Sequence, residues 1–330
     1  MKALEEALDR VLSCGEISRD EALVLYRDAP LEELTRAADA IRRARCGTTF
    51  DLCAIINGKS GRCSENCRFC AQSAHNGAKI DEYELLSADE IVAGAKRAEA
   101  AGVLRFSIVT SGKRLSSREV DQLCEAIRRI RAETSLAVCC SSGLLSVESF
   151  RALKAAGMTR AHNNLETSRR FFPSICTTHS YDEKLAALRA AREAGLSLCS
   201  GGIFGLGETA EDRIDMALTL RDVGVESVPI NILNAIPGTP LAETAPLTST
   251  DARRIVAIYR FLLPTASIRL AGGRGLLDDF GFRCFESGAN ATITGAMLTT
   301  GGVDAKSDLQ MIRILGYRPG LDGREGESAR

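Results

Sequence analysis

The residues with the clearest capacity for chemistry are Cys63, Cys67 and Cys70, which stand at C-x3-C-x2-C spacing. Gly58 and Gly61 precede them, so the segment can form a loop wrapped around a metal centre. Thiolates are soft ligands that favour iron–sulfur clusters, zinc or copper(I). Three thiolates can hold three irons of a [4Fe–4S] cube and leave the fourth iron open. Such a cluster could bind a small molecule through its open iron.

Two other readings of these cysteines compete with the cluster. Their spacing, i, i+4 and i+7, is also one face of a helix, which would make them buried structural residues. Against the helix, the residues between the thiols are polar and offer no apolar partners: Ser64, Glu65, Asn66 and Arg68. The other reading is a Cys3His zinc site completed by His75, although the spacing specifies this histidine poorly.

The cysteine spacing resembles the signature of radical S-adenosylmethionine (SAM) enzymes. In that family the open iron binds the amino and carboxylate groups of SAM, and electron transfer cleaves SAM to a 5′-deoxyadenosyl radical. Phe69 stands where the family has an aromatic residue beside the adenine. The resemblance implies two cofactors, a [4Fe–4S] cluster on Cys63, Cys67 and Cys70, and SAM.

Composition limits the class of protein. The chain has 330 residues, of which 45% are hydrophobic and 26% charged, with a formal net charge of −1. This size suits one α/β barrel, and the near-zero charge argues against nucleic-acid or membrane partners. The N-terminus reads as an amphipathic helix rather than a signal peptide, and no apolar run is long enough to span a bilayer. Twelve cysteines indicate a reducing, cytoplasmic setting with metal or redox use.

Strand and helix patterns alternate from residue 52 onward. Predicted strands cover residues 52–56, 104–109, 136–140, 160–165, 196–204, 227–233, 267–271 and 291–293, and helical patterns cover residues 87–101, 117–133, 146–156, 182–194, 210–223 and 250–263. Eight strands alternating with helices predict an α/β fold, a closed (β/α)8 TIM barrel, with an open doubly wound sheet as the alternative. The cysteine loop follows the first strand, at the barrel end where chemistry takes place.

We expect three segments along the chain. Residues 1–45 form an N-terminal helical extension that caps the barrel, with a candidate capping box from Ser18 to Glu21. Residues 46–318 form the radical SAM barrel. Residues 319–330 are polar and glycine-rich, and we expect a disordered tail there.

A second set of motifs resembles the biotin synthase family over residues 53–315. They are NNLET at 163–167, CSGGIFGLGET at 199–209, SVPIN at 227–231, GTP at 238–240, IRL at 268–270 and LTT at 298–300. Members of this family use SAM radicals to insert sulfur between two unactivated carbons of dethiobiotin. The sulfur comes from an auxiliary iron–sulfur cluster inside the barrel. The resemblance implies dethiobiotin as substrate, a homodimer, and an electron donor such as flavodoxin or ferredoxin.

The resemblance also assigns the SAM contacts. Gly201 and Gly202 match the strand end that approaches SAM, and Ile203 would pack on the adenine. Asn164 and Glu166 match the pair that bridges the SAM ribose and the ureido ring of the substrate. The family usually has Asp at the second position; Glu keeps the acceptor chemistry on a longer arm. Read without the resemblance, the glycines would be a strand-to-helix turn and the isoleucine a core residue.

Three further residues match substrate contacts of the family. Asn231 matches the other ureido contact, and Thr299 and Thr300 match hydroxyls near the substrate carboxylate. Without the resemblance each would be read as a turn or cap residue.

The auxiliary-cluster positions depart from the familiar pattern. The familiar enzyme holds a [2Fe–2S] cluster with three cysteines and one arginine, and Cys139, Cys199 and Arg269 match three of these four ligands. Ser107 stands at the fourth position. A neutral hydroxyl is a poor iron ligand compared with a thiolate, so the familiar ligand set is broken.

Cys53 stands where the familiar enzyme has a serine beside the arginine, and it restores a set of three thiolates with Cys139 and Cys199. Such a set could hold a cubane whose open iron carries the sulfide donated to biotin. We therefore prefer a [4Fe–5S] auxiliary cluster, which resembles a variant class of the family, over a [2Fe–2S] centre. Cys176 is a possible additional ligand.

Two other functions stay open at this point. One is a related radical SAM enzyme, of the hydrogenase maturase or methylornithine synthase type. The other is a zinc-stabilised binding protein without catalysis, which would contain zinc and no iron.

Overall fold

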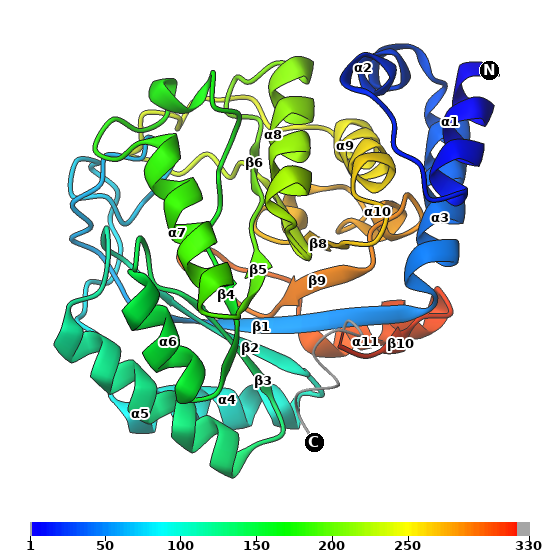
Figure 1. Cartoon of the computed structure of the whole chain (residues 1–330). Helices are drawn as coiled ribbons and strands as arrows, with labels where there is room; N and C mark the ends of the chain where they lie inside the picture. Colours follow the sequence, from blue (N-terminus) through cyan, green and yellow to red (C-terminus); the bar gives the residue numbers. More distant parts are fainter. Residues whose placement is uncertain (1, 322–330) are drawn as a thin grey trace.

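The chain folds into a closed barrel of parallel strands, as seen in a computed structural model that describes residues 2–321 (Figure 1). The barrel strands, in hydrogen-bonded order, are β1 (Thr49–Lys59), β2 (Arg105–Thr110), β3 (Ala137–Ser141), β4 (Met158–His162), β5 (Ser197–Cys199), β7 (Ser227–Ile232), β8 (Ser267–Leu270) and β9 (Ala291–Thr294). The last strand, β9, pairs with β1 and closes the ring. The predicted (β/α)8 barrel is confirmed, and the open doubly wound sheet is wrong.

The fifth strand position is divided between β5 and β6 (Gly202–Phe204), and both pair with β7. Between them Gly201 runs so close to β7 that a Cβ atom there would lie 2.0 Å from the carbonyl oxygen of Pro229. Only glycine fits such an approach. The single strand predicted over residues 196–204 is therefore two short strands.

The fourth strand also differs from its prediction, residues 160–165. β4 begins at Met158 and ends at His162, so Asn164 and Glu166 lie in the loop beyond it. This loop is on the side of the barrel where the functional residues were predicted.

Helices with polar N-caps connect most of the strands. They are α4 (Ala88–Ala100), α5 (Ser117–Glu133), α6 (Val147–Ala155), α7 (Tyr181–Glu193), α8 (Ala210–Val223) and α9 (Ser249–Leu262). Each begins at a Ser or Thr whose side chain accepts a backbone hydrogen bond from the first turn. Such caps satisfy N–H groups that a helix start leaves unpaired. A short local motif therefore sets where each helix begins and how long the preceding loop is.

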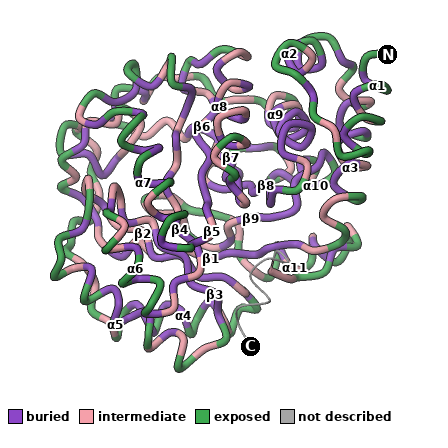
Figure 2. The backbone as a smooth tube through the Cα atoms, viewed as in Figure 1, coloured by how far each residue is buried: buried purple, intermediate pink, exposed green. Residues whose placement is uncertain are grey.

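The strands are buried on both faces (Figure 2). On β2, Phe106 and Ile108 belong to the apolar core between strands and helices, whereas Arg105 and Ser107 line a cavity inside the barrel. Successive side chains of a strand point to opposite faces, which explains this alternation. The layer outside the strands is apolar and supports the fold, while the interior mixes charged and thiol side chains with apolar ones such as Ile55 and Val109.

Three N-terminal helices pack beside α8 and α9 (Figure 1): α1 (Lys2–Leu12), α2 (Arg19–Asp28) and α3 (Leu31–Cys46). The capping box between Ser18 and Glu21 is confirmed at the start of α2. Ion pairs tie this layer to the barrel helices, from Arg19 to Asp215 and from Arg253 to Glu32. The division into cap, barrel and tail stays a prediction.

The C-terminal part completes the barrel with η2 (Arg274–Leu276), α10 (Phe282–Phe285), α11 (Ala305–Ile314) and β10 (Arg318–Pro319). β10 pairs with β1, and the N–H of Gly320 donates to the carbonyl of Phe50. The predicted tail, residues 319–330, thus begins within a strand pair. Its residues 322–330 lie outside the described residues.

Arg260 joins α9 to the strands that follow it. Its guanidinium is fully buried and donates hydrogen bonds to the carbonyls of Gly288, Leu263, Pro264 and Ala266 and to Oδ1 of Asn290. The same Asn290 oxygen accepts from the N–H of Ile268, at the start of β8. This one side chain therefore organises the approach to β8 and β9.

We predict that Arg260→Met lowers the free energy of unfolding by at least about 3 kcal/mol, because each buried acceptor left unpaired costs about 1–3 kcal/mol. Anaerobic urea denaturation of the cluster-free protein measures this change. The matched control is Arg151→Met on α6, whose exposed ion pair with Glu193 should contribute no more than about 0.5 kcal/mol. Equal effects of the two substitutions would contradict the role of Arg260.

Candidate active site

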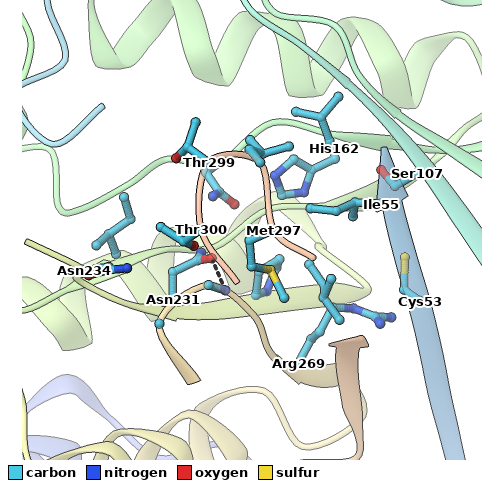
Figure 3. A pocket seen from close by; sticks show the side chains of 18 of the residues that line it. Cys53, Ile55, Ser107, His162, Asn231, Asn234, Arg269, Met297, Thr299 and Thr300 are labelled. Carbon is cyan, nitrogen blue, oxygen red and sulfur yellow. Dashed lines mark hydrogen bonds between the residues drawn. The ribbon is translucent and has the colours of Figure 1, made fainter. Parts of the chain in front are cut away.

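A cavity opens at the C-terminal ends of the strands and reaches into the barrel (Figure 3). Its outer part is lined by residues that follow the strands, among them Phe69, Asn164, Met297, Thr299 and Thr300. Its inner part is lined by side chains of the strands themselves: Cys53, Arg105, Ser107, Cys139, Arg160, His162, Cys199 and Arg269. Barrel enzymes carry their chemistry at this end.

The loop after β1, residues 60–86, carries the first set of cysteines. Cys63, Cys67 and Cys70 are half-buried, and Cys70 lines the cavity. Backbone hydrogen bonds shape the loop, from the N–H of Cys70 to the carbonyl of Cys67 and from the N–H of Cys63 to the carbonyl of Gln72. The segment contains no helix, so the reading of these cysteines as one face of a helix is wrong.

The zinc reading finds no support in the geometry. Ligands of a single ion lie close together, yet across residues 2–321 no such group contains Cys63, Cys70 or His75. His75 is exposed, and its Nε2 lies 3.0 Å from the carbonyl oxygen of Ser64. Thiolates that each bind a different iron of a cluster stand farther apart than ligands of one ion, so this loop suits a cluster better.

Cys67 lies beside Cys176 and His179, with potential ligand atoms within 4.8 Å of one another. The Sγ atom of Cys176 is 3.3 Å from Nδ1 of His179, which also contacts the carboxylate of Glu65. A hydrogen bond from Cys67, with help from His179, holds the pKa of Cys176 well below its usual range despite burial. Cys176 does not line the inner cavity. The structure therefore places it at the first cysteine loop and not at the auxiliary-cluster position for which it was considered.

Phe69 and Ile203 form an apolar wall of the cavity. Both pack on a small hydrophobic cluster, Ile175, Leu206, Leu233 and Leu241, which is separate from the main core. A flat apolar wall of this kind fits an aromatic base such as adenine.

The side chain of Glu166 has one carboxylate oxygen that no hydrogen bond satisfies within residues 2–321. Its backbone adopts φ +70° and is bonded on both sides, from its N–H to Gly201 and from Ile203 to its carbonyl. Its Oε2 is buried and has no hydrogen-bond partner within residues 2–321, and burial raises the pKa of this carboxyl. Beside it, Oδ1 of Asn164 accepts a 3.0 Å hydrogen bond from the N–H of Gly201. A sugar hydroxyl would satisfy the unpartnered oxygen.

The glycines at this strand end are explained by packing. A Cβ on Gly202 would lie 2.4 Å from the carbonyl oxygen of Glu166 and 2.6 Å from Sδ of Met216. Gly201 meets Pro229 in the same way. Their contact with SAM therefore stays a prediction.

Asn231 joins two chain segments at the rim. Its Oδ1 accepts from the N–H of Gly272 at 3.0 Å (Figure 3). Its Nδ2 donates to the carbonyl of Gly202, also at 3.0 Å. Each amide atom keeps capacity for one further hydrogen bond. Thr299 and Thr300 lie in a loop across the same rim, which Asn57 holds through a 3.2 Å hydrogen bond to the carbonyl of Leu298.

The second set of cysteines lies deeper and comes from three strands. Cys53 on β1, Cys139 on β3 and Cys199 on β5 are buried and line the inner cavity, with Ser107 on β2 beside Cys139 in register. Within the described residues they do not form a single-ion ligand group. Three thiols spread around one cavity can instead hold several irons.

The thiols of this inner set differ in their electrostatics. Burial raises the pKa of Cys53 to about 11. For Cys199, burial is opposed by His162 and Arg269, which bring its pKa down to about 7. Cys199 is therefore the inner cysteine best prepared to act as a thiolate ligand.

Below the inner cysteines lies a buried charge network. Asp51 is two residues before Cys53 on β1, and its Oδ2 pairs with Arg105 at 3.0 Å, Arg269 at 2.8 Å and Arg160 at 3.5 Å. All four side chains are at most 2% exposed. Positive charge from these guanidiniums opposes the effect of burial on the inner thiols, from Arg269 and Arg105 at Cys53 and from Arg269 and Arg160 at Cys199, and so favours anionic thiolates in the cavity above.

Comparison with known proteins identifies the family. Residues 57–220 match the radical SAM superfamily, and residues 229–318 match the Biotin and Thiamin Synthesis associated domain. The chain is 57% identical over 313 residues to biotin synthase 2 of Corynebacterium diphtheriae, covering 94% of each chain. It is 53% identical to the biotin synthase of Akkermansia muciniphila, covering 96% of this chain and 98% of that one. The chain belongs to the biotin synthase family.

Two solved structures share the fold of this chain. A methylornithine synthase has a TM-score of 0.84 at 20% identity, covering 98% of this chain and all of that one. A maturase of the [FeFe]-hydrogenase has a TM-score of 0.83 at 20% identity, covering 97% and 75% of the two chains. At this identity the likeness shows the barrel and not the reaction, so biotin synthase is the family that the sequence identities support. Across residues 2–321 no helix combines the length and apolarity needed to cross a membrane.

The prediction from sequence missed His162, Asp51, Arg105 and Arg160 in this biotin synthase site. A signal for two of them was available, since Arg160 and His162 stand two residues apart within the strand predicted over residues 160–165 and so share one face of it. His162 lies with Nδ1 3.2 Å from Sγ of Cys199. Charged residues within buried strands are a general sign of an interior site.

We predict that Asp51→Asn destabilises the cluster-free protein by about 3–5 kcal/mol at neutral pH, because it removes the buried negative charge that pairs with Arg105, Arg160 and Arg269. The arginines hold the folded-state pKa of Asp51 below its usual range against the effect of burial. Its stabilisation is therefore complete well above pH ~4, the unfolded value, and declines as the pH falls below it.

Urea denaturation of both proteins at pH 7 and pH 3 measures this difference. The difference in unfolding free energy between the original protein and Asp51→Asn should be smaller at pH 3 than at pH 7. Asp89→Asn, which removes an exposed partner of Arg129, is the control and should change stability little at either pH. A gap that is negligible at pH 7 would contradict the importance of Asp51.

Proposed function

We propose that this protein inserts sulfur into dethiobiotin at two unactivated carbons to form biotin, using SAM as the radical source. The observation that carries the proposal is that one cavity is lined at its mouth by the first cysteine loop and at its base by a second set of three cysteines. One set serves to start radical chemistry and the other to hold the sulfur. A substrate bound between the two cysteine sets would lie next to both of them.

At the mouth, Cys63, Cys67 and Cys70 would hold the [4Fe–4S] cluster. When bound, this cluster supplies the electron that cleaves SAM. Phe69 and Ile203 would hold the adenine against their apolar wall, and Glu166 would accept a hydrogen bond from the ribose through its unpartnered Oε2. Gly201 and Gly202 would line the same side.

At the base, Cys53, Cys139 and Cys199 would hold the auxiliary cluster, for which we prefer [4Fe–5S] over [2Fe–2S]. Arg269 would act there as a nearby positive charge, because its guanidinium is already engaged with Asp51 and with the carbonyl of Thr292. Ser107 would not be a ligand.

Between the clusters, Asn164 and Asn231 would bind the ureido ring of dethiobiotin. Both side chains line the cavity, and Asn231 keeps one donor and one acceptor free for a ligand. Thr299 and Thr300 would donate hydroxyl hydrogen bonds to the substrate carboxylate at the rim.

The family resemblance extends this proposal to the surroundings of the protein. It implies a homodimer and an electron donor such as flavodoxin or ferredoxin. A cytoplasmic setting accords with an enzyme that needs reducing conditions for its thiolates and clusters.

We predict that replacing Cys63, Cys67 or Cys70 by Ala abolishes 5′-deoxyadenosine formation, since each thiolate holds a different iron. Chromatography of the anaerobic reaction measures this product. Cys124→Ala, at a buried position within α5, is the control and should retain cleavage. Cleavage that persists in any of the three loop variants would refute the assignment.

We predict that Cys53→Ser removes the auxiliary cluster and biotin formation but spares SAM cleavage, because Cys53 replaces the ligand lost at Ser107. Iron and sulfide counts, with a spectrum of each centre, measure this loss. Arg269→Met should keep the auxiliary iron.

Cys140→Ser is the matched control, since Cys140 belongs to the apolar core outside the cavity. It should keep both clusters. The assignment fails if Cys53→Ser retains a full auxiliary cluster, or if Ser107 or Arg269 proves to be bonded to iron.

A further inference from the structure

Cys67, Cys176 and His179 meet at the first cysteine loop, although Cys67 is far from the other two in the chain. Their potential ligand atoms all lie within 4.8 Å of one another, and Sγ of Cys176 is 3.3 Å from Nδ1 of His179. Across residues 2–321 no other group of three His, Cys, Asp or Glu side chains is close enough to share one metal ion. The proposed function uses only Cys67 of the three, so it leaves Cys176 and His179 unexplained.

Hydrogen bonds on both sides of the two cysteines hold their thiols beside each other. On one side, the N–H of Thr177 donates to Oδ1 of Asn66 at 2.9 Å, and Nδ2 of Asn66 donates to Oγ1 of Thr177 at 2.7 Å. On the other side, the N–H of Arg68 donates to the carbonyl of Ile175 at 3.0 Å. Each cysteine stands between two residues bonded in this way, so the fold itself brings the two thiols together.

His179 is fixed with Nδ1 toward the same space. Its ring packs edge-to-face against Phe172, with the centroids 5.6 Å apart, and Oε2 of Glu65 lies 2.5 Å from Nδ1. Glu65 is held in turn, because its Oε2 accepts a 2.8 Å hydrogen bond from Oγ1 of Thr178. Nδ1 therefore has both the sulfur of Cys176 and a carboxylate oxygen as neighbours.

This arrangement is close to the geometry that zinc requires. Zinc takes four ligands in a tetrahedron, at about 2.3 Å for sulfur and about 2.0 Å for nitrogen, so its ligand atoms lie about 3.3–3.8 Å apart. The 3.3 Å between Cys176 and His179 falls in that range. Two thiolates and an imidazole favour zinc over magnesium or calcium. A small shift of the Glu65 carboxylate would supply the fourth ligand.

We propose that Cys67, Cys176 and His179 bind one zinc ion while the first cysteine loop holds no cluster. Binding releases protons from the thiols and moves no electrons. The ion occupies Cys67 and so excludes the SAM cluster, which needs the same thiolate. The zinc site is independent of the proposed function, and only this competition for Cys67 rests on it.

The test uses the full chain with Cys63→Ala and Cys70→Ala, reduced anaerobically and freed of metal. This protein can neither build the cluster in the loop nor bind zinc through the three loop cysteines together. Cobalt(II) is the probe, because tetrahedral cobalt bound to thiolates absorbs light and zinc that displaces it does not. We expect thiolate–cobalt absorption that zinc abolishes. If this absorption does not form, the proposal is overturned without any further variant.

Further substitutions in the same protein locate the ion. Cys176→Ser should reduce the bound cobalt by one ion per chain. His179→Gln should weaken binding by more than the about tenfold that loss of an outer-shell partner costs, and it decides the question where Cys176→Ser does not fold. Cys140→Ser, in the apolar core, is the control and should bind cobalt as before. Cobalt binding that neither Cys176→Ser nor His179→Gln weakens overturns the site.

The competition for Cys67 is measured on the original chain. Zinc added to the metal-free protein before iron and sulfide should reduce 5′-deoxyadenosine formation, and the reduction should be smaller in Cys176→Ser. Equal inhibition of the two proteins overturns the competition. If the original chain forms no 5′-deoxyadenosine even without zinc, the proposed function fails, while the cobalt result still decides the zinc site.

Discussion

The interior of this barrel depends on the ion pairs of one buried carboxylate. Asp51 faces Arg105, Arg160 and Arg269 in a space from which water is excluded. Most barrels of this kind fill their interior with layers of branched apolar side chains. Here the polar layer fixes three long side chains in place, and their guanidiniums act on the inner cysteines against the effect of burial. A site that stabilises thiolates is the physical consequence.

The two sets of cysteines are built in different ways. Cys63, Cys67 and Cys70 come from one loop, so their separation depends mainly on local chain geometry. Cys53, Cys139 and Cys199 come from three strands, so their separation depends on the register of the whole ring. Inward positions on neighbouring strands face the same cavity, which explains how a thiol at Cys53 could take over from a position now held by Ser107.

The walls near the mouth combine structural and functional demands. Asn231 joins Gly202 to Gly272, and Glu166 exchanges backbone hydrogen bonds with the strand end that carries the glycines. These hydrogen bonds fix the side chains in place without a ligand. The same side chains retain donors and acceptors that a ligand could use. Preorganised groups lose less entropy when they bind a ligand.

The sequence alone determined the class of fold, the positions of most helices and the first cysteine set. Period-two and helical patterns, Ser and Thr caps and the spacing of Cys63, Cys67 and Cys70 are all local signals, and local signals survive in a linear chain. The departure at Ser107 and Cys53 was also visible, although only through the family resemblance.

The tertiary structure decided what depends on contacts between distant segments. It divided the fifth strand at Gly201, because that residue meets Pro229 on β7. It placed Cys176 beside Cys67, brought Asp51 together with three arginines from other strands, and set His162 against Cys199. A sequence shows which side chains alternate on a strand, but barrel closure and register decide which of them meet, because those contacts join residues far apart in the chain.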